Sequence, residues 1–154
     1  MLSKGLLAGA AGTVALDLFS YGDMLVRGRV ASTLPSTVVQ KLATRLGWGT
    51  CANADDDAAK NRRSAAGALL GYGVGLGAGV GYALVRPTFE GWLPWPVAGV
   101  ILGAATLVAS EGSATALGAT DWRTWSAADW ISDVVPRTLY GMTAAWVVES
   151  FGAW

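Results

Sequence analysis

The chain has 154 residues, 53% of them hydrophobic and 14% charged, whereas soluble domains carry about 25% charged residues. Its formal net charge is zero, which removes the general electrostatic basis for binding nucleic acid, and we expect no such partner. Histidine is absent and there is one cysteine, so imidazole catalysis, histidine–metal sites and intrachain disulfides are excluded. The 21 glycines and eight tryptophans favour an integral membrane protein.

The first apolar segment, residues 2–26, is long enough to cross a hydrocarbon core of ~30 Å. Lys4 ahead of an apolar run is also typical of a signal peptide, but the run continues without a small-residue cleavage site. We therefore interpret it as a retained membrane span. Three further apolar segments follow, at residues 65–85, 95–117 and 137–154. The predicted fold is an all-α, four-helix transmembrane bundle forming a single membrane domain over residues 1–154.

A short amphipathic helix is predicted at residues 34–47, with Pro35 in its first turn and Gly47 as its C-terminal stop. One face is apolar and the other is basic and polar, which is typical of a helix on the membrane surface. A solvated helix within a loop is the alternative. The acidic run at residues 55–57 matches no calcium-loop spacing and suits a helix N-terminus, where negative charge is favoured. We expect no metal site.

The second span, residues 65–85, carries glycines at four-residue intervals in two stripes. Small residues at this spacing let a neighbouring backbone approach closely in a membrane. The stripes are two residues out of phase, which separates them by roughly 200° around a 3.6-residue helix. We therefore expect this helix to lie between two others. The helix-packing glycines are Gly67, Gly71, Gly75 and Gly79 in one stripe and Gly73, Gly77 and Gly81 in the other.

The third span is predicted at residues 95–117. A capping-box pattern of Ser126 and Asp129 then starts a second short amphipathic helix, which we expect Pro136 to end. Pro136 opens the fourth span at residues 137–154, whose length is close to the lower limit of about 17 residues.

An internal repeat is indicated by residues 9–17 and 103–111, which align without a gap. Each stretch is followed by a loop, a short amphipathic helix and a second span. We predict a tandem duplication, with repeat 1 at about residues 2–86 and repeat 2 at about residues 95–154. Both copies enter the membrane in the same direction, which predicts a pseudo-two-fold axis along the membrane normal. A chance match between small-residue runs is the alternative.

Basic residues set the predicted orientation. Nine of the 11 Lys and Arg residues lie between the first and second spans or between the third and fourth, and only Lys4 and Arg86 lie on the other side. The positive-inside rule places both amphipathic helices in the cytoplasm and both termini outside. Glu149 lies near the outer end of the last span. We expect it to pair with Arg86 or Lys4 in a structural role.

Ionisable residues inside the spans are candidate functional groups, because placing a charge in the bilayer is costly. Asp17 and Glu111 occupy matching positions in the two repeats. If they face each other, they would share a proton or hold a cation, with Tyr21 and Thr115 completing the polar site. The alternative is that each carboxyl is protonated or hydrogen-bonded and holds the helices together. Nucleophile-elbow, P-loop, CxxC and metal-ligand patterns are missing, so the sequence predicts no cofactor and supports no enzyme.

Several stretches carry a resemblance that covers nearly the whole chain. They are Gly-Ala-Ala-Gly-Thr at 9–13, Arg-Gly-Arg at 27–29, Ser-Thr-Leu-Pro-Ser at 32–36 and Thr-Ala-Leu-Gly-Ala-Thr-Asp-Trp-Arg-Thr-Trp-Ser-Ala-Ala-Asp-Trp-Ile-Ser-Asp-Val-Val-Pro at 115–136. These stretches resemble a family of small, uncharacterised actinobacterial membrane proteins with four spans. The resemblance implies a bacterial plasma membrane and no particular activity.

Three functions stay open at this point. The two-sided glycine helix favours a binding or assembly protein, either a homo-oligomer or an accessory subunit of a larger membrane complex. The intramembrane carboxylates favour a small proton- or cation-coupled carrier or channel. The basic amphipathic helix favours a lipid-binding or lipid-modifying protein. The expected partners are membrane lipids together with other membrane subunits or further copies of the chain.

Overall fold

The computed structural model describes residues 1–48 and 56–151, and within them the secondary structure is helical with no strand. The elements are α1 (Leu2–Arg27), α2 (Leu34–Arg45), α4 (Asp57–Phe89), α5 (Trp95–Ala116), the short 3-10 helix η1 (Trp122–Thr124) and α6 (Ala127–Ser150). The predicted all-α class is confirmed, and the amphipathic segment at 34–47 forms a helix as expected.

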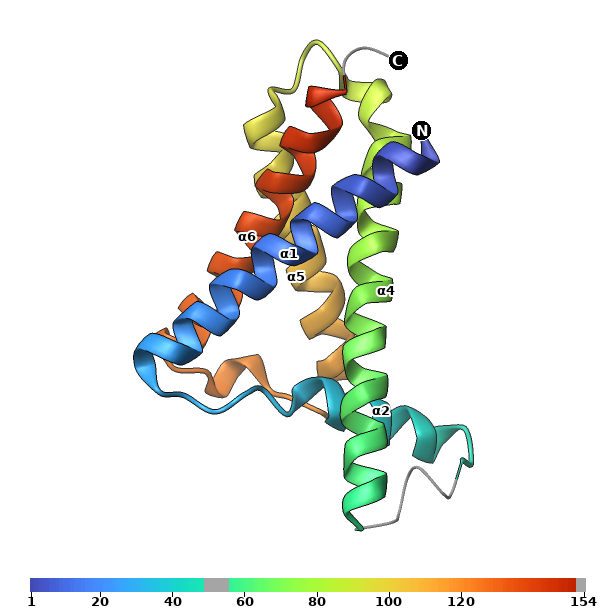
Figure 1. Ribbon diagram of the computed structural model, residues 1–154, viewed down its shortest axis with the longest axis vertical. Coiled ribbons are helices and arrows are strands. Elements are labelled where there is room, and N and C mark those ends of the chain that lie inside the picture. Colours follow the sequence, from blue (N-terminus) through green and yellow to red (C-terminus); the bar gives the residue numbers. More distant parts are fainter. Residues whose placement is uncertain (49–55, 152–154) are drawn as a thin grey trace.

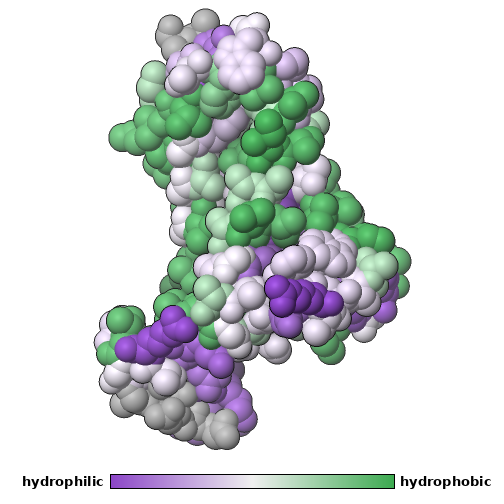
Figure 2. Space-filling model, turned by 180° about the vertical axis from the view of Figure 1, so that it is seen from behind, coloured by the Kyte–Doolittle hydropathy of each residue, from purple (hydrophilic) through white to green (hydrophobic). Residues whose placement is uncertain are grey.

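Three of these helices are long and apolar enough to cross a membrane, namely α1, α4 and α5. Although α6 has 24 residues, its first half carries Asp133, Pro136 and Arg137, which lower its hydropathy. The last three residues of the predicted fourth span lie outside the described part of the chain. Apolar side chains cover the upper and middle parts of the molecule in Figure 2, and most hydrophilic residues gather at its lower end.

In Figure 1, α4 runs along the length of the molecule and α1 crosses it obliquely, while α2 lies across the end where α4 begins. Packing is extensive between α1 and α4, between α1 and α6, and between α5 and α6. In contrast, α4 meets α5 and α6 at only a few positions. The predicted pseudo-two-fold axis is therefore wrong for this arrangement, because it would require α5 to pack on α4 as closely as α1 packs on α6.

Small residues dominate the shared core, as expected where helix backbones approach closely. Two tyrosines supply the largest side chains, and Tyr140 of α6 donates a hydrogen bond of 2.6 Å to the carbonyl of Gly75 on α4. The core residues are Ala8, Tyr82, Ala83, Ala98, Leu102, Tyr140, Ala144, Ala145 and Val148.

The expected break at Pro136 is wrong, because α6 continues through it from Ala127 to Ser150. A proline inside a helix removes one backbone hydrogen bond and disfavours the helix by about 3 kcal/mol. Here Pro136 is buried, and α6 packs against both α1 and α5, so tertiary contacts outweigh the local preference. The capping box of Ser126 and Asp129 is confirmed as the start of this single long helix.

The second span is also longer than predicted, since α4 covers 33 residues and begins at Asp57. Asp56 is its N-cap and accepts a hydrogen bond of 2.6 Å from the backbone N–H of Ala59. The predicted helix start at the acidic run is therefore confirmed for Asp56 and Asp57, and Asp55 lies outside the described residues. At ~1.5 Å per residue, α4 is longer than a bilayer core, so its basic first turns extend beyond the apolar region.

Candidate functional site

Three of the four glycines in one stripe of α4, Gly67, Gly75 and Gly79, pack against atoms of neighbouring helices. A Cβ atom added at Gly79 would lie 2.5 Å from the Cα of Gly9 and 2.6 Å from the carbonyl oxygen of Gly5, both on α1. At Gly67 the same atom would lie 2.8 Å from the backbone of Pro35 on α2, and Gly75 faces Thr13 of α1. These glycines are required because neighbouring atoms occupy the space that a side chain would take.

The other stripe is open. Added Cβ atoms at Gly73, Gly77 and Gly81 would meet nothing within 4 Å, and the same holds for Gly71 of the first stripe. The expectation that α4 lies between two other helices, one against each stripe, is wrong within the chain because both α1 and α2 contact the side of α4 that carries the first stripe. The reason is the order of packing, in which α1 and α2 cover one side of α4 while α5 and α6 pack elsewhere.

The pair α5 and α6 crosses through glycines in the same way as α1 and α4. A Cβ atom at Gly99 would lie 3.0 Å from the carbonyl oxygen of Gly141, and one at Gly103 would lie 2.6 Å from that of Arg137. In both helix pairs, two glycines four residues apart on the first helix face two positions four residues apart on the second. This shared register is a property of the backbone crossing, and sequence alignment of the first helices alone does not reveal it.

The structure does not bring Asp17 and Glu111 together. Asp17 is half-buried on α1 and accepts a hydrogen bond of 3.3 Å from the hydroxyl of Tyr72 on α4. Glu111 lies on α5, which has no extensive contact with α1, and it pairs with Arg137 of α6. The predicted carboxylate pair is therefore wrong. The reason is that α6 lies next to α1 and also covers the face of α5 that carries Glu111.

The remaining two predicted site residues are also separated. Tyr21 is 65% exposed near the end of α1, away from Glu111. Thr115 lies one turn after Glu111 on α5, and its hydroxyl is buried without a hydrogen-bond partner among the described residues. Glu111 and Thr115 thus belong to one region, and Asp17 and Tyr21 to another.

A partly buried polar cluster of Ser110, Glu111, Asp133 and Arg137 joins α5 to α6. Nη2 of Arg137 donates to Oε1 of Glu111 and to the hydroxyl of Ser110, each at 2.9 Å. Nη1 of the same guanidinium donates to Asp133, one turn earlier on α6. Glu111 is only 7% exposed. The guanidinium therefore joins two carboxylates from different helices.

This cluster holds more negative than positive charge. Two carboxylates share one guanidinium, and the second oxygens of Glu111 and Asp133 are buried without hydrogen-bond partners in the described part of the chain. A buried carboxylate oxygen that lacks a donor is costly, and a proton or a cation would relieve that cost. Groups of three or more His, Cys, Asp or Glu that suit a metal ion are not found in the described residues.

Sequence reasoning found Glu111 but missed both of its neighbours. It assigned Arg137 to a loop as a topology signal and gave Asp133 no role. The available signal was the spacing of Asp133 and Arg137, which places opposite charges on one face of a helix. Because we expected Pro136 to end one helix, Asp133 and Arg137 were assigned to different segments and their spacing was not considered.

A second ion pair closes the opposite end of the molecule. Nε of Arg86 on α4 lies 2.6 Å from Oε1 of Glu149 on α6, which confirms the expected pairing. The side chain of Arg86 is only 4% exposed, and its guanidinium lies 5.4 Å from the ring centre of Phe89. This ion pair connects α4 to α6. Lys4, the other expected partner of Glu149, donates instead to the carbonyl of Phe151 at 3.3 Å.

The chain was compared with protein families, curated proteins and solved structures. No family model, curated protein or solved structure matches the chain.

Proposed function

We propose that this chain is a membrane assembly protein that docks another transmembrane helix on the open glycine face of α4. The face consists of Gly73, Gly77 and Gly81. The observation that carries the proposal is the contrast within one helix, where Gly75 and Gly79 are filled by α1 and these three glycines meet open space. The partner is a second copy of the chain or the helix of a larger complex.

The exposure of α4 supports this proposal. Only 17% of its most apolar stretch is buried within the chain, against 33% for α5. A glycine in the middle of a helix has no side chain to offer to lipid, and its value in a membrane is close contact with another backbone. A helix that fits against α4 would give this face the same packing that α1 gives the opposite face.

The membrane arrangement proposed with this function has four spans, including α6, in a bacterial plasma membrane. The start of α1 and the end of α6 lie at the same end of the molecule in Figure 1, as an even number of crossings requires. We place this end outside and the basic end with α2 in the cytoplasm. The shared glycine register of the two helix pairs supports a tandem origin of the two halves, in spite of the missing two-fold axis.

The test is a leucine at the centre of the open face. Gly77→Leu should leave the protomer folded, because nothing lies within 4 Å of the added Cβ, and should weaken association at least tenfold. Association is measured by cross-linking in native membranes and by light scattering after extraction in mild detergent. Gly112→Leu is the matched control, since Gly112 on α5 is equally open but lies outside the stripe.

Two outcomes would contradict the proposal. One is a wild-type chain that stays monomeric in its native membrane without any co-purifying protein. The other is unchanged association in Gly77→Leu. Co-purification of a different membrane protein would identify an accessory subunit, whereas a symmetric complex of one chain would identify a homo-oligomer.

The α5–α6 polar cluster favours a second candidate function, a small proton- or cation-coupled carrier. Its support is the excess carboxylate described above, which has a reason to bind a positive ion. Glu111→Gln combined with Asp133→Asn should abolish ion flux in liposomes, and Asp17→Asn is the control because it changes a half-buried carboxyl outside the cluster. Equal flux in the wild type and the double variant would exclude this function.

A further inference from the structure

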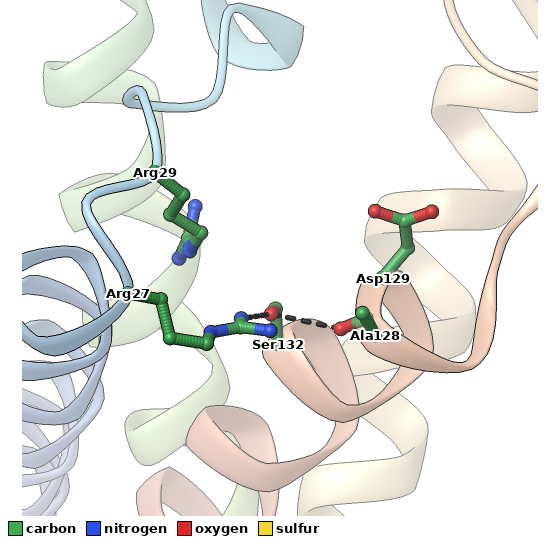
Figure 3. Close-up of a pocket in the computed structure, with 5 residues that line it drawn as sticks. All are labelled: Arg27, Arg29, Ala128, Asp129 and Ser132. Atoms are coloured by element: carbon green, nitrogen blue, oxygen red, sulfur yellow. Dashed lines mark hydrogen bonds between the residues drawn. The ribbon is translucent and has the colours of Figure 1, made fainter.

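A polar cleft lies where α1 ends and α6 begins, and the proposed function does not use it. Its volume is about 320 Å³, at the lower end of the range found for ligand pockets. Figure 3 shows that the arginines come from the end of α1 and the segment after it, and that the facing wall belongs to the first turns of α6. The lining residues are Arg27, Arg29, Ala128, Asp129 and Ser132.

The α1 wall of the cleft is positively charged. Asp23 accepts one hydrogen bond of 2.6 Å from Nη2 of Arg27 and another of 2.6 Å from Nε of Arg29. One carboxylate therefore balances one of the two guanidinium charges. A guanidinium carries five N–H donors, so both arginines keep donors beyond these bonds. Arg27 also donates to the hydroxyl of Ser132, which ties the two walls together.

The α6 wall is negatively charged. Figure 3 shows the Asp129 carboxylate across the gap from Arg29. Oδ2 of Asp129 accepts the backbone N–H of Ser126 at 2.8 Å and its hydroxyl at 2.6 Å, which fixes the side chain. The cleft therefore offers a cation on one wall and an anion on the other. A ligand with a single charge complements only one of the two walls.

The surroundings of the cleft have the character of a membrane–water interface. Trp130 follows Asp129 and packs against Trp122 and Trp125, with ring centres 6.3 and 5.2 Å apart respectively. Such tryptophan clusters are typical of the headgroup level of a bilayer. On α1, directly before the arginines, Leu25 and Val26 are 86% and 85% exposed. A polar cleft bordered by aromatic and aliphatic side chains suits an amphipathic ligand.

We propose that this cleft binds the headgroup of a glycerophospholipid that carries both a phosphate and a primary ammonium. The phosphate accepts hydrogen bonds from Arg27 and Arg29, which suit its oxygens by geometry and charge. The ammonium donates to Asp129. The acyl chains then extend along the exposed aliphatic side chains at the end of α1. A headgroup without the ammonium leaves Asp129 facing a second negative charge.

The experiment compares phosphatidylethanolamine with phosphatidylglycerol of identical acyl chains, bound to the purified full-length chain in neutral detergent and measured by native mass spectrometry. The wild type should bind the ethanolamine lipid about tenfold more tightly, because only that lipid has an N–H donor for the carboxylate. Asp129→Asn should remove this preference and leave the affinity for phosphatidylglycerol the same or higher. Arg29→Gln should weaken both lipids about tenfold.

Matched variants separate binding from folding. Asp57→Asn removes a carboxylate from an exposed position on α4 outside the cleft, so the lipid preference should persist. Arg62→Gln removes a charge from an exposed position on α4 outside the cleft and should change neither affinity. Equal binding of the two lipids by the wild type, or unchanged binding in Arg29→Gln, would overturn the proposal. Displacement by inorganic phosphate as readily as by soluble glycerophosphoethanolamine would identify a free-anion site and overturn it too.

Discussion

The two helix pairs, α1 with α4 and α5 with α6, share a backbone crossing but differ in what lies beside it. Each crossing is made by two glycines that face the partner backbone at the same four-residue spacing. Beside the first crossing, Asp17 accepts a hydrogen bond from the hydroxyl of Tyr72 at a half-exposed site. Beside the second, Glu111 is buried and paired with Arg137.

The difference follows from where each pair lies in the packing order. Since α6 lies between α1 and α5, Asp133 and Arg137 on it are partly enclosed and need partners. In contrast, α4 lies at the edge, so Tyr72 is half-exposed and the second glycine face stays uncovered. The same crossing therefore supports an ion cluster in one pair and a docking face in the other. Substitutions at corresponding positions in the two helix pairs should distinguish the ion cluster from the docking face.

The largest expected difference between the two helix pairs is the loss of stability when the polar partner of Glu111 or of Asp17 is removed. Arg137→Met leaves the buried carboxylate of Glu111 and the half-buried one of Asp133 without their cation and should lower the free energy of unfolding by about 3 kcal/mol. Tyr72→Phe removes one long hydrogen bond at an exposed site and should cost about 0.6 kcal/mol. Both are measured by unfolding in mixed micelles with increasing sodium dodecyl sulfate.

A combined variant controls for the loss of the arginine side chain itself. Adding Glu111→Gln and Asp133→Asn to Arg137→Met removes the unpaired charges and should restore most of the lost stability. If the triple variant is as unstable as Arg137→Met, the effect comes from packing and not from charge.

A smaller and equal effect is expected at the two crossings. Gly9→Ala and Gly103→Ala place a methyl group 2.7 Å from the carbonyl oxygen of Gly75 and 2.6 Å from that of Arg137, respectively. Each should cost about 1–3 kcal/mol in the same unfolding assay, because backbone must move to admit the methyl group. Gly22→Ala on α1 and Gly112→Ala on α5 meet nothing within 4 Å and should cost nothing. Unequal costs at Gly9 and Gly103 would show that the crossings are not equivalent.

The smallest effects are expected at the helix starts. Asp56→Ala on α4 and Ser126→Ala on α6 each remove an N-cap and should cost about 1 kcal/mol. Hydrogen exchange of the first-turn amides measures this loss directly. Equal exchange in the wild type and the variants would show that these caps do not hold the first turns.

The stability of the first turn of α6 should also depend on pH. Hydrogen bonds from the Ser126 side chain and backbone N–H lower the pKa of Asp129 below its usual range. Since the folded pKa is the lower one, this contribution is complete above the unfolded pKa of about 4 and is lost as the pH falls through the folded value. Protection of the first turn of α6 should therefore decrease in acid, and less so in Ser126→Ala. An identical pH dependence in both proteins would contradict the assignment.

Several features could be predicted from the sequence because they depend on local chemistry. Apolar runs of sufficient length predicted the helical class, and Arg86 was one of the two partners, with Lys4, that the sequence offered for Glu149. The capping box at Ser126 and the helix start at the acidic run depend on residues three or four positions apart. Glycine spacing predicted that α4 packs closely against another helix, but it predicted this for both stripes, and only the stripe with Gly67, Gly75 and Gly79 is covered within the chain.

Only the tertiary structure decided which helices are neighbours. The pairing of Asp17 with Glu111 failed because α6 lies between their helices in the packing order, and no local pattern encodes that order. Burial of Pro136 kept α6 continuous against its local preference, and this continuity brought Asp133 and Arg137 onto one face opposite Glu111. The open face of α4 and the cleft between α1 and α6 likewise exist only because distant segments meet, or fail to meet, in space.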